Sequence, residues 1–155
     1  MAKTSENIRN LVIIGHGGTG KTSLSEAMMY IMGKTTRMGS TDAKNTVSDY
    51  RKEEMDKGVS VVSTLMSGEY SGKDLNIIDT PGFADFLAEV KGGLRVAETA
   101  IVTVSGVSGV EVGTEQVWDY ADEVDRARMI VVNNLDRENA NFDKVLDELK
   151  EVFGV

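Results

Sequence analysis

The 155-residue chain contains no cysteine. This excludes disulfide bonds and metal sites built on thiolates, and it makes the cytoplasm the expected location. No apolar run approaches the roughly 20 residues that a membrane span needs, and the first residues show no signal-peptide pattern. We therefore expect no contact with a membrane.

Positive charge is also scarce. The chain has 17 Lys and Arg residues against 25 Asp and Glu residues, which gives a net charge of −8. This balance argues against a domain that clamps nucleic acid as a whole, and we expect no direct DNA binding. A docking contact made by one face stays open. The apolar share of 41% is ordinary for a globular protein, and the length suits one domain with a proper core.

Apolar runs alternate with segments of helical periodicity along the chain. The expected strands cover 8–14, 59–69, 74–79, 99–105 and 128–134, and the expected helices cover 21–32, 83–98, 112–125 and 142–153. This alternation predicts an α/β fold with a mostly parallel, doubly wound sheet. A turn at 70–73 joins 59–69 to 74–79 as a hairpin, which adds one antiparallel pair.

Two further expectations concern local structure. The apolar stripe of the helix at 83–98 begins with Phe83, which we expect in the core. The segment 33–57 is polar and lacks sustained periodicity, so it is either a loop that orders around a ligand or a disordered segment.

Gly15-His16-Gly17-Gly18-Thr19-Gly20-Lys21-Thr22 has the Walker A spacing between an apolar strand and a helix. Glycines allow the backbone to turn and point several N–H groups at phosphate oxygens, and the following helix adds its positive end. Lys21 would reach the β- and γ-phosphates, and the Thr22 hydroxyl would bind Mg²⁺. The motif predicts a nucleotide-phosphate site, which also includes Ser23.

Asp79-Thr80-Pro81-Gly82 closes the strand at 74–79. A carboxylate at this end of a strand can hold Mg²⁺ through a water, and Gly82 can offer its N–H to the γ-phosphate. By itself the sequence is an ordinary turn, but after a Walker A motif it indicates a γ-phosphate sensor. We therefore predict catalytic roles for Lys21 and Gly82.

Asn133-Asn134-Leu135-Asp136 follows the strand at 128–134. At this point of a P-loop GTPase, an Asn/Lys-x-Asp turn lets the carboxylate accept hydrogen bonds from guanine N1 and N2. Asp136 would then select guanine, Asn134 would lie against the base, and Asn133 would brace the turn against the P-loop (residues 15–22). An ordinary Asn/Asp-rich turn is the alternative.

The chain resembles the translational GTPases, in particular the G domain of elongation factor G and its bacterial relatives. The resemblance is carried by the three motifs above, by the runs 45–50 and 57–61 with Glu53 and Glu54, and by Asp136-Arg137-Glu138-Asn139-Ala140. It implies a three-layer P-loop NTPase fold that uses GTP/GDP and Mg²⁺. Residues 33–60 would be the first switch, with Ser60 as a Mg²⁺ ligand, and Asp79 to about Gly93 the second.

The resemblance further implies a GTP-hydrolysing ribosomal factor for translocation or recycling, with the ribosome contacted through the full-length protein. The family adds a further strand and helix to this domain. We therefore expect residues 1–155 to be a G domain truncated at its C-terminus, with an exposed edge that allows self-association. A naturally short protein is the alternative.

Four positions depart from the family pattern. Gly17-Gly18 replaces a family Asp, Ser60 replaces Thr, Phe83 replaces His, and Asn134 replaces Lys. Phe83 cannot exchange a proton, which predicts slow hydrolysis. Asn134 covers less of the base, which predicts weaker nucleotide affinity. His16, the only histidine, is interpreted as a P-loop residue rather than a replacement for the missing one.

These departures leave a second function open beside the GTPase, namely a GTP/GDP-responsive switch with little hydrolysis. A third function, a P-loop ATPase outside translation, is disfavoured by Asp136.

Overall fold

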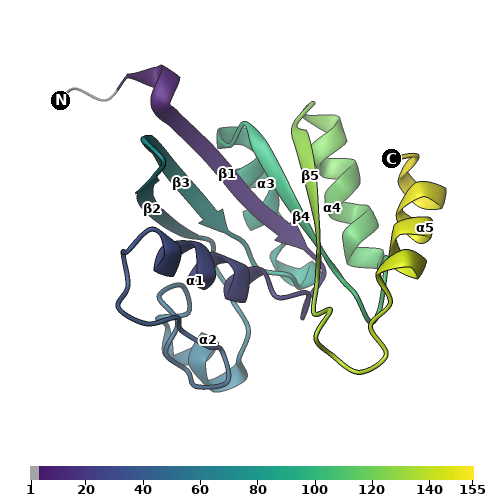
Figure 1. The fold of residues 1–155 in the computed structure, drawn as a ribbon, viewed down its shortest axis with the longest axis horizontal. Coiled ribbons are helices and arrows are strands. Elements are labelled where there is room, and N and C mark those ends of the chain that lie inside the picture. The colour runs from purple at the N-terminus through teal and green to yellow at the C-terminus, as the bar shows by residue number, and fades with distance from the viewer. Residues whose placement is uncertain (1–3) are drawn as a thin grey trace.

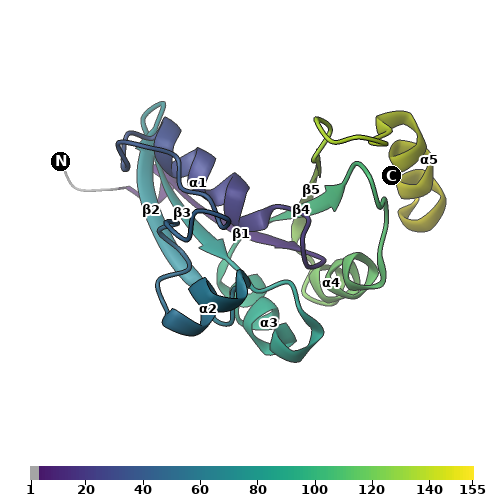
Figure 2. The same cartoon turned by 90° about the horizontal axis from the view of Figure 1, so that it is seen from below.

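The computed structural model describes residues 4–155 and shows helices on both faces of one five-stranded sheet (Figures 1 and 2). The strands are β1 (Ile8–Gly15), β2 (Thr64–Tyr70), β3 (Lys73–Asp79), β4 (Thr99–Ser105) and β5 (Ala127–Asn133). The α-helices are α1 (Lys21–Ile31), α2 (Lys52–Lys57), α3 (Leu87–Val96), α4 (Val112–Glu123) and α5 (Phe142–Phe153), and short 3₁₀ turns lie at Ser5–Asn7 and Ala84–Phe86. Within this part of the chain, no helix has the length and apolar character needed to cross a membrane.

The sheet has the order β2-β3-β1-β4-β5, and only the β2–β3 pair is antiparallel. This confirms the predicted mostly parallel α/β fold. The expected hairpin is also present, since β2 pairs antiparallel with β3. In its turn, Ser71 and Gly72 have positive φ angles of 49° and 73°. Two such residues form the tight turn that matches the twist of paired strands.

Alternate side chains of β1 point into two apolar layers. Ile13 packs with Met29, Met66, Ile77 and Ile101 on the α1 side. Val12 and Ile14 pack with the buried faces of α3, α4 and α5 on the other side. The two layers account for a sheet covered on both faces (Figure 2). The stacked rings of Trp118 and Phe153, with centroids 4.3 Å apart, join α5 to α4.

Two expected elements differ from those observed. The strand expected at 59–69 begins only at Thr64, because the N–H groups of Val61 and Val62 donate to Glu54 Oε1 at 2.9 and 3.2 Å instead of to a neighbouring strand. The helix expected at 83–98 begins as a 3₁₀ turn at Ala84 and becomes α-helical at Leu87. Phe83 therefore precedes the helix, and its side chain is 47% exposed rather than in the core.

The polar segment 33–57 is ordered around buried carboxylates, and it contains the short helix α2. Glu26 on α1 is 1% exposed and accepts hydrogen bonds from the N–H groups of Gly39 and Val47. Glu54 on α2 is fully buried. Glu89 on α3, which is partly buried, accepts from the N–H of Ser63, a few residues beyond the segment, at 2.8 Å. The contacts of Glu26 and Glu89 hold the stretch from Gly39 to Ser63 against α1 and α3.

Candidate functional site

The candidate site is a cleft of about 190 Å³ at the carboxyl ends of the parallel strands. The loops that follow β1, β3 and β5 meet there, and the segment 41–60 closes one side (Figure 1). This position follows the general rule for ligand sites in open α/β sheets. The lining includes most of the P-loop, together with Asp49, Ser60, Gly82, Phe83, Asn134 and Arg137.

The P-loop is held in shape by contacts to β4 and to the last residue of β5. Thr19 Oγ1 lies 2.7 Å from Thr103 Oγ1, and Asn133 Nδ2 donates to the Thr19 carbonyl at 2.9 Å. Asn133 thus ties the end of β5 to the P-loop. Gly20 has φ +86°, and a Cβ there would collide with the Asn133 amide, so only glycine fits. Gly15 and Thr19 are buried and support the loop from behind the cleft.

Lys21 lies at the centre of the loop and is only 6% exposed. Its Nζ donates to the carbonyls of Gly15 and His16 at 3.1 and 2.9 Å. Burial lowers the pKa of Lys21 to about 8, while the charge of Asp79 opposes this shift. The Lys21 ammonium is therefore held in a poorly solvated place where an anionic ligand would interact strongly with it.

Three elements bring hydroxyl and carboxylate oxygens together beside Lys21. Thr22 Oγ1 donates to Asp79 Oδ2 at 2.9 Å and lies 3.3 Å from Ser60 Oγ. Adjacent ligands in an octahedral Mg²⁺ shell, each about 2.1 Å from the metal, lie roughly 3 Å apart. The donor set and its spacing therefore fit Mg²⁺.

Asp79 has further capacity to bind a cation. Its Oδ1 is buried without a hydrogen bond of good geometry, although the nearby Ser48 hydroxyl acts to lower its pKa. Burial raises the pKa of Asp79 to about 6, against the Thr22 hydrogen bond and the Lys21 charge. Within residues 4–155, no cluster of three or more His, Cys, Asp and Glu side chains offers an alternative metal site.

Asp49 is a site residue that sequence reasoning missed. It comes from the polar segment 33–57, is 5% exposed, and accepts a 2.7 Å hydrogen bond from Ser60 Oγ. Burial raises its pKa, and the Ser60 hydrogen bond acts against that rise. The only signal was its place in the run 45–50 that carries the family resemblance. Asp49 therefore takes the hydroxyl hydrogen of Ser60, which leaves the lone pairs of the Ser60 oxygen for a cation.

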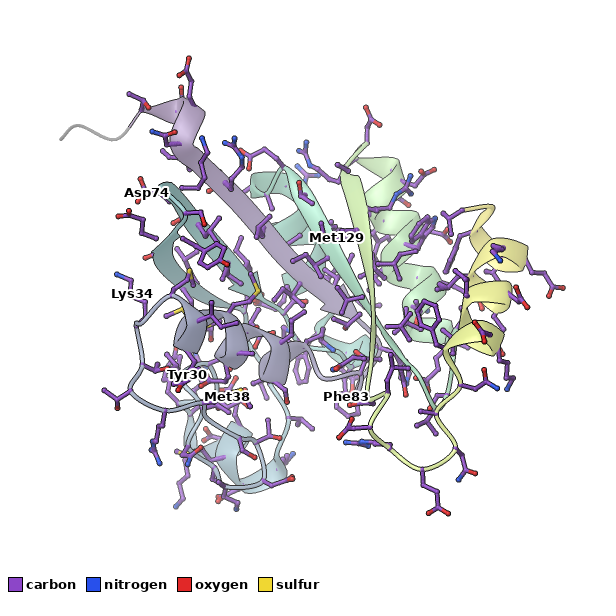
Figure 3. The ribbon with its side chains drawn as sticks, viewed as in Figure 1. Tyr30, Lys34, Met38, Asp74, Phe83 and Met129 are labelled. Carbon is purple, nitrogen blue, oxygen red and sulfur yellow. The ribbon has the colours of Figure 1, made fainter. Side chains whose placement is uncertain are left out.

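Gly82 and Phe83 form the wall of the cleft next to the P-loop. A Cβ on Gly82 would collide with Lys21 Nζ, so glycine is required for this close approach. The Phe83 ring lies 3.5 Å from where a Gly17 Cβ would be (Figure 3). Gly17 and Phe83 are therefore neighbours in the cleft wall, and an apolar ring occupies this part of the cleft.

The His16 side chain points away from the cleft. Its Nε2 lies 3.6 Å from Glu111 Oε1, and its ring packs on Gly113 at the start of α4. Only its backbone carbonyl contacts Lys21. This geometry agrees with the interpretation of His16 as a loop residue.

The turn after β5 closes the other end of the cleft. Asn134 has φ +59°, and its Nδ2 lies 3.5 Å from the Gly18 carbonyl. Asp136 is exposed on this turn and is not among the residues that line the cleft. Arg137 does line it, although sequence reasoning assigned it no role.

The buried carboxyl of Asp79 should make the nucleotide-free, Mg²⁺-free chain less stable as the pH rises from about 4 to 6. Its pKa is near 6 when folded and 3.8 in the reference state, so the unfolded chain loses this proton first and gains stability relative to the folded one. Asp79→Asn removes the effect. In urea unfolding, the free energy of unfolding of Asp79→Asn should therefore exceed that of wild type by a larger margin at pH 7 than at pH 4.

Glu98→Gln provides a control of opposite sign. Although its slight burial acts to raise the pKa of Glu98, two hydrogen bonds from Asn10, each 2.9 Å, make the net shift downward. The wild-type Glu98 side chain therefore adds to the free energy of unfolding as the pH rises, and Glu98→Gln should lack this added stability. A similar pH response of the two variants would contradict the assignment to Asp79.

Comparisons with known proteins agree with this geometry. The sequence model of the elongation factor Tu GTP binding domain matches residues 6–154. An elongation factor G-like protein of Thermotoga maritima is 42% identical over 148 residues, which cover 96% of this chain and 21% of that protein. Mitochondrial ribosome-releasing factor 2 of Drosophila virilis is 40% identical over 146 residues, which cover 94% of this chain and 20% of that protein.

A solved structure supports the same relationship. A crystal structure of a Thermus thermophilus protein superposes with a TM-score of 0.91 at 35% identity, covering 95% of this chain and 22% of that one. This chain spans about a fifth of the length of the curated relatives above. With its P-loop, its β3 and β5 turns and its sheet order, the chain belongs to the family of the elongation factor Tu GTP binding domain, in the G-domain fold of the translational GTPases.

Proposed function

We propose that the chain binds and hydrolyses GTP, with Mg²⁺, as the G domain of an elongation factor G-like protein that acts on the ribosome in translocation or recycling. The observation that carries this proposal is the convergence of Lys21, the Thr22–Ser60–Asp79 oxygens and the 133–137 turn on one cleft. A phosphate ligand, its metal ion and a base each find suitable groups there.

The chemistry would rest on position and charge. Lys21 would exchange its two carbonyl partners for phosphate oxygens. The Gly82 N–H would reach the γ-phosphate. Thr22, Ser60 and Asp79 would hold Mg²⁺, which when bound neutralises charge on the phosphates. Water would attack the γ-phosphate in line, and the loss of that phosphate would free the segments 33–60 and 79–93 to move.

Phe83 favours the second candidate, a switch with little hydrolysis. Its ring is half exposed at the P-loop wall and has no group that accepts a proton. Single-turnover release of γ-phosphate, with and without ribosomes, separates the two functions. Elongation-factor-like speed with ribosomes would establish the GTPase and refute the slow-hydrolysis prediction.

Guanine selection by Asp136 is tested by exchanging its carboxylate for an amide. Asp136→Asn should weaken GDP binding by roughly 5- to 150-fold, which corresponds to the 1–3 kcal/mol of a bidentate base contact. It should strengthen binding of xanthosine diphosphate, because the amide can donate to the xanthine 2-oxygen. Calorimetric titration of both nucleotides and of ADP measures this, and unchanged GDP affinity would contradict the role.

The remaining proposals concern the cellular setting. We propose a cytoplasmic protein in which residues 1–155 are part of a longer chain that reaches the ribosome. Self-association through β5 is also proposed, since β5 is an edge strand and Met129 on it is 57% exposed (Figure 3). Light scattering at several protein concentrations tests the self-association.

A further inference from the structure

Two basic side chains are found among the described residues that line the cleft, Lys21 and Arg137. Lys21 is buried at the P-loop and is bonded to carbonyls. The guanidinium of Arg137 is exposed, and it makes no hydrogen bond or ion pair with any of residues 4–155. An unpaired guanidinium beside a cleft is available to a ligand.

The backbone of the β5 turn fixes where Arg137 begins. Arg137 N donates to the Asn134 carbonyl at 3.2 Å, and the Arg137 carbonyl accepts from Ala140 N at 3.2 Å. The side chain therefore starts from an ordered turn that also carries Asn134 and Asp136, at the end of the cleft that this turn closes. This is the end assigned to the base under the proposed function.

Asn134 offers little apolar cover to a base from this turn. Its amide is turned toward the Gly18 carbonyl at 3.5 Å, and its side chain has only one methylene. Arg137 has three methylenes and a flat head that stacks on aromatic faces. We infer that Arg137 covers one face of the guanine base, which Asn134 leaves open. This inference rests on the proposed function, because it requires a guanine nucleotide in the cleft.

If Arg137 stacks on the base, removing its side chain should cause a moderate loss of affinity that is confined to ligands with a base. Arg137→Ala should weaken GDP binding by about 3- to 30-fold. Binding of Mg²⁺-pyrophosphate, which lacks a base, should be unchanged. Arg95→Ala is the matched control, because Arg95 is an exposed arginine on α3 away from the cleft lining. Calorimetric titration of the full chain with GDP and with pyrophosphate gives both values.

A double-variant cycle tests whether Arg137 and a lysine at 134 would share one base face. Asn134→Lys should raise GDP affinity more strongly in the Arg137→Ala background than in wild type, because the lysine stem then covers an open face. Equal gains in both backgrounds would overturn the inference.

The outcomes are distinct from failure of the proposed function. If wild type binds neither GDP nor pyrophosphate, the proposed function and this inference both fail. If wild type binds GDP and Arg137→Ala binds it equally well, only the Arg137 inference is overturned. A matching loss for pyrophosphate would assign Arg137 to the phosphates instead of the base, which also overturns it.

Discussion

Phe83→His should raise the rate of single-turnover GTP hydrolysis on the ribosome by about 10²- to 10⁴-fold, the usual contribution of a positioned acid–base group. The phenyl ring lies close to where a Cβ on Gly17 would be, and it lines the cleft next to Gly82. An imidazole at that place could accept or donate a proton beside the attacking water. Rapid-quench measurement of γ-phosphate release from bound GTP gives the rate.

Phe83→Leu separates proton transfer from simple opening of the site. Leucine removes the ring but supplies no titratable group, so the leucine variant should hydrolyse GTP about as slowly as wild type. An equal acceleration in both variants would assign the slow rate to steric blocking by the ring. A histidine variant as slow as wild type would show that the missing proton acceptor is not the limiting feature.

Lys21→Ala should lower GDP affinity by about 10²- to 10⁴-fold. Lys21 would make about two charge-assisted hydrogen bonds to phosphate oxygens, each contributing about 1.5–3 kcal/mol. The nucleotide-free fold should remain, because burial disfavours this charge and lowers the pKa of Lys21 to about 8. Titration with GDP and thermal unfolding without nucleotide measure the two effects.

Lys34→Ala is the control for the loss of GDP affinity. Lys34 follows α1, at the opposite end of the helix from Lys21, and is exposed (Figure 3). Its removal subtracts the same unit of charge from the chain without touching the cleft. Similar losses from both variants would mean that overall charge, rather than the buried contact, governs nucleotide binding.

The sheet could be predicted because its residues obey local rules. The strand runs around Val12, Ile77 and Val102 are apolar on both faces, as a sheet covered on both sides requires. The two positive-φ residues of the hairpin turn were likewise signalled by the Ser71-Gly72 pair. Element ends were less predictable, and α2 was not foreseen, because its six residues include only one apolar side chain, Met55.

The site was predictable where glycines and spacing carried the signal, as in the P-loop and the turn after β3. The contributions of Asp49 and Arg137 were not, because each depends on how an irregular loop folds beside the cleft, which no local pattern signals. Phe83 was misplaced for a related reason. Its spacing fits the apolar stripe of the next helix, but the chain begins that helix only after Phe83 has turned toward the P-loop.

The contacts of Glu26, Glu54 and Glu89 have a consequence for sequence variation. All three carboxylates hold the irregular segment 39–63 by its backbone N–H groups rather than by its side chains. Exposed residues of that segment should therefore be exchangeable without changing its path. The three acids on α1, α2 and α3 should not be, nor should Asn45, Thr46 and Asp49, whose side chains bond within the segment. A library randomised over exposed positions such as Asp42 and Ala43 should stay folded, whereas a single amide at Glu26 or Glu54 should release the segment.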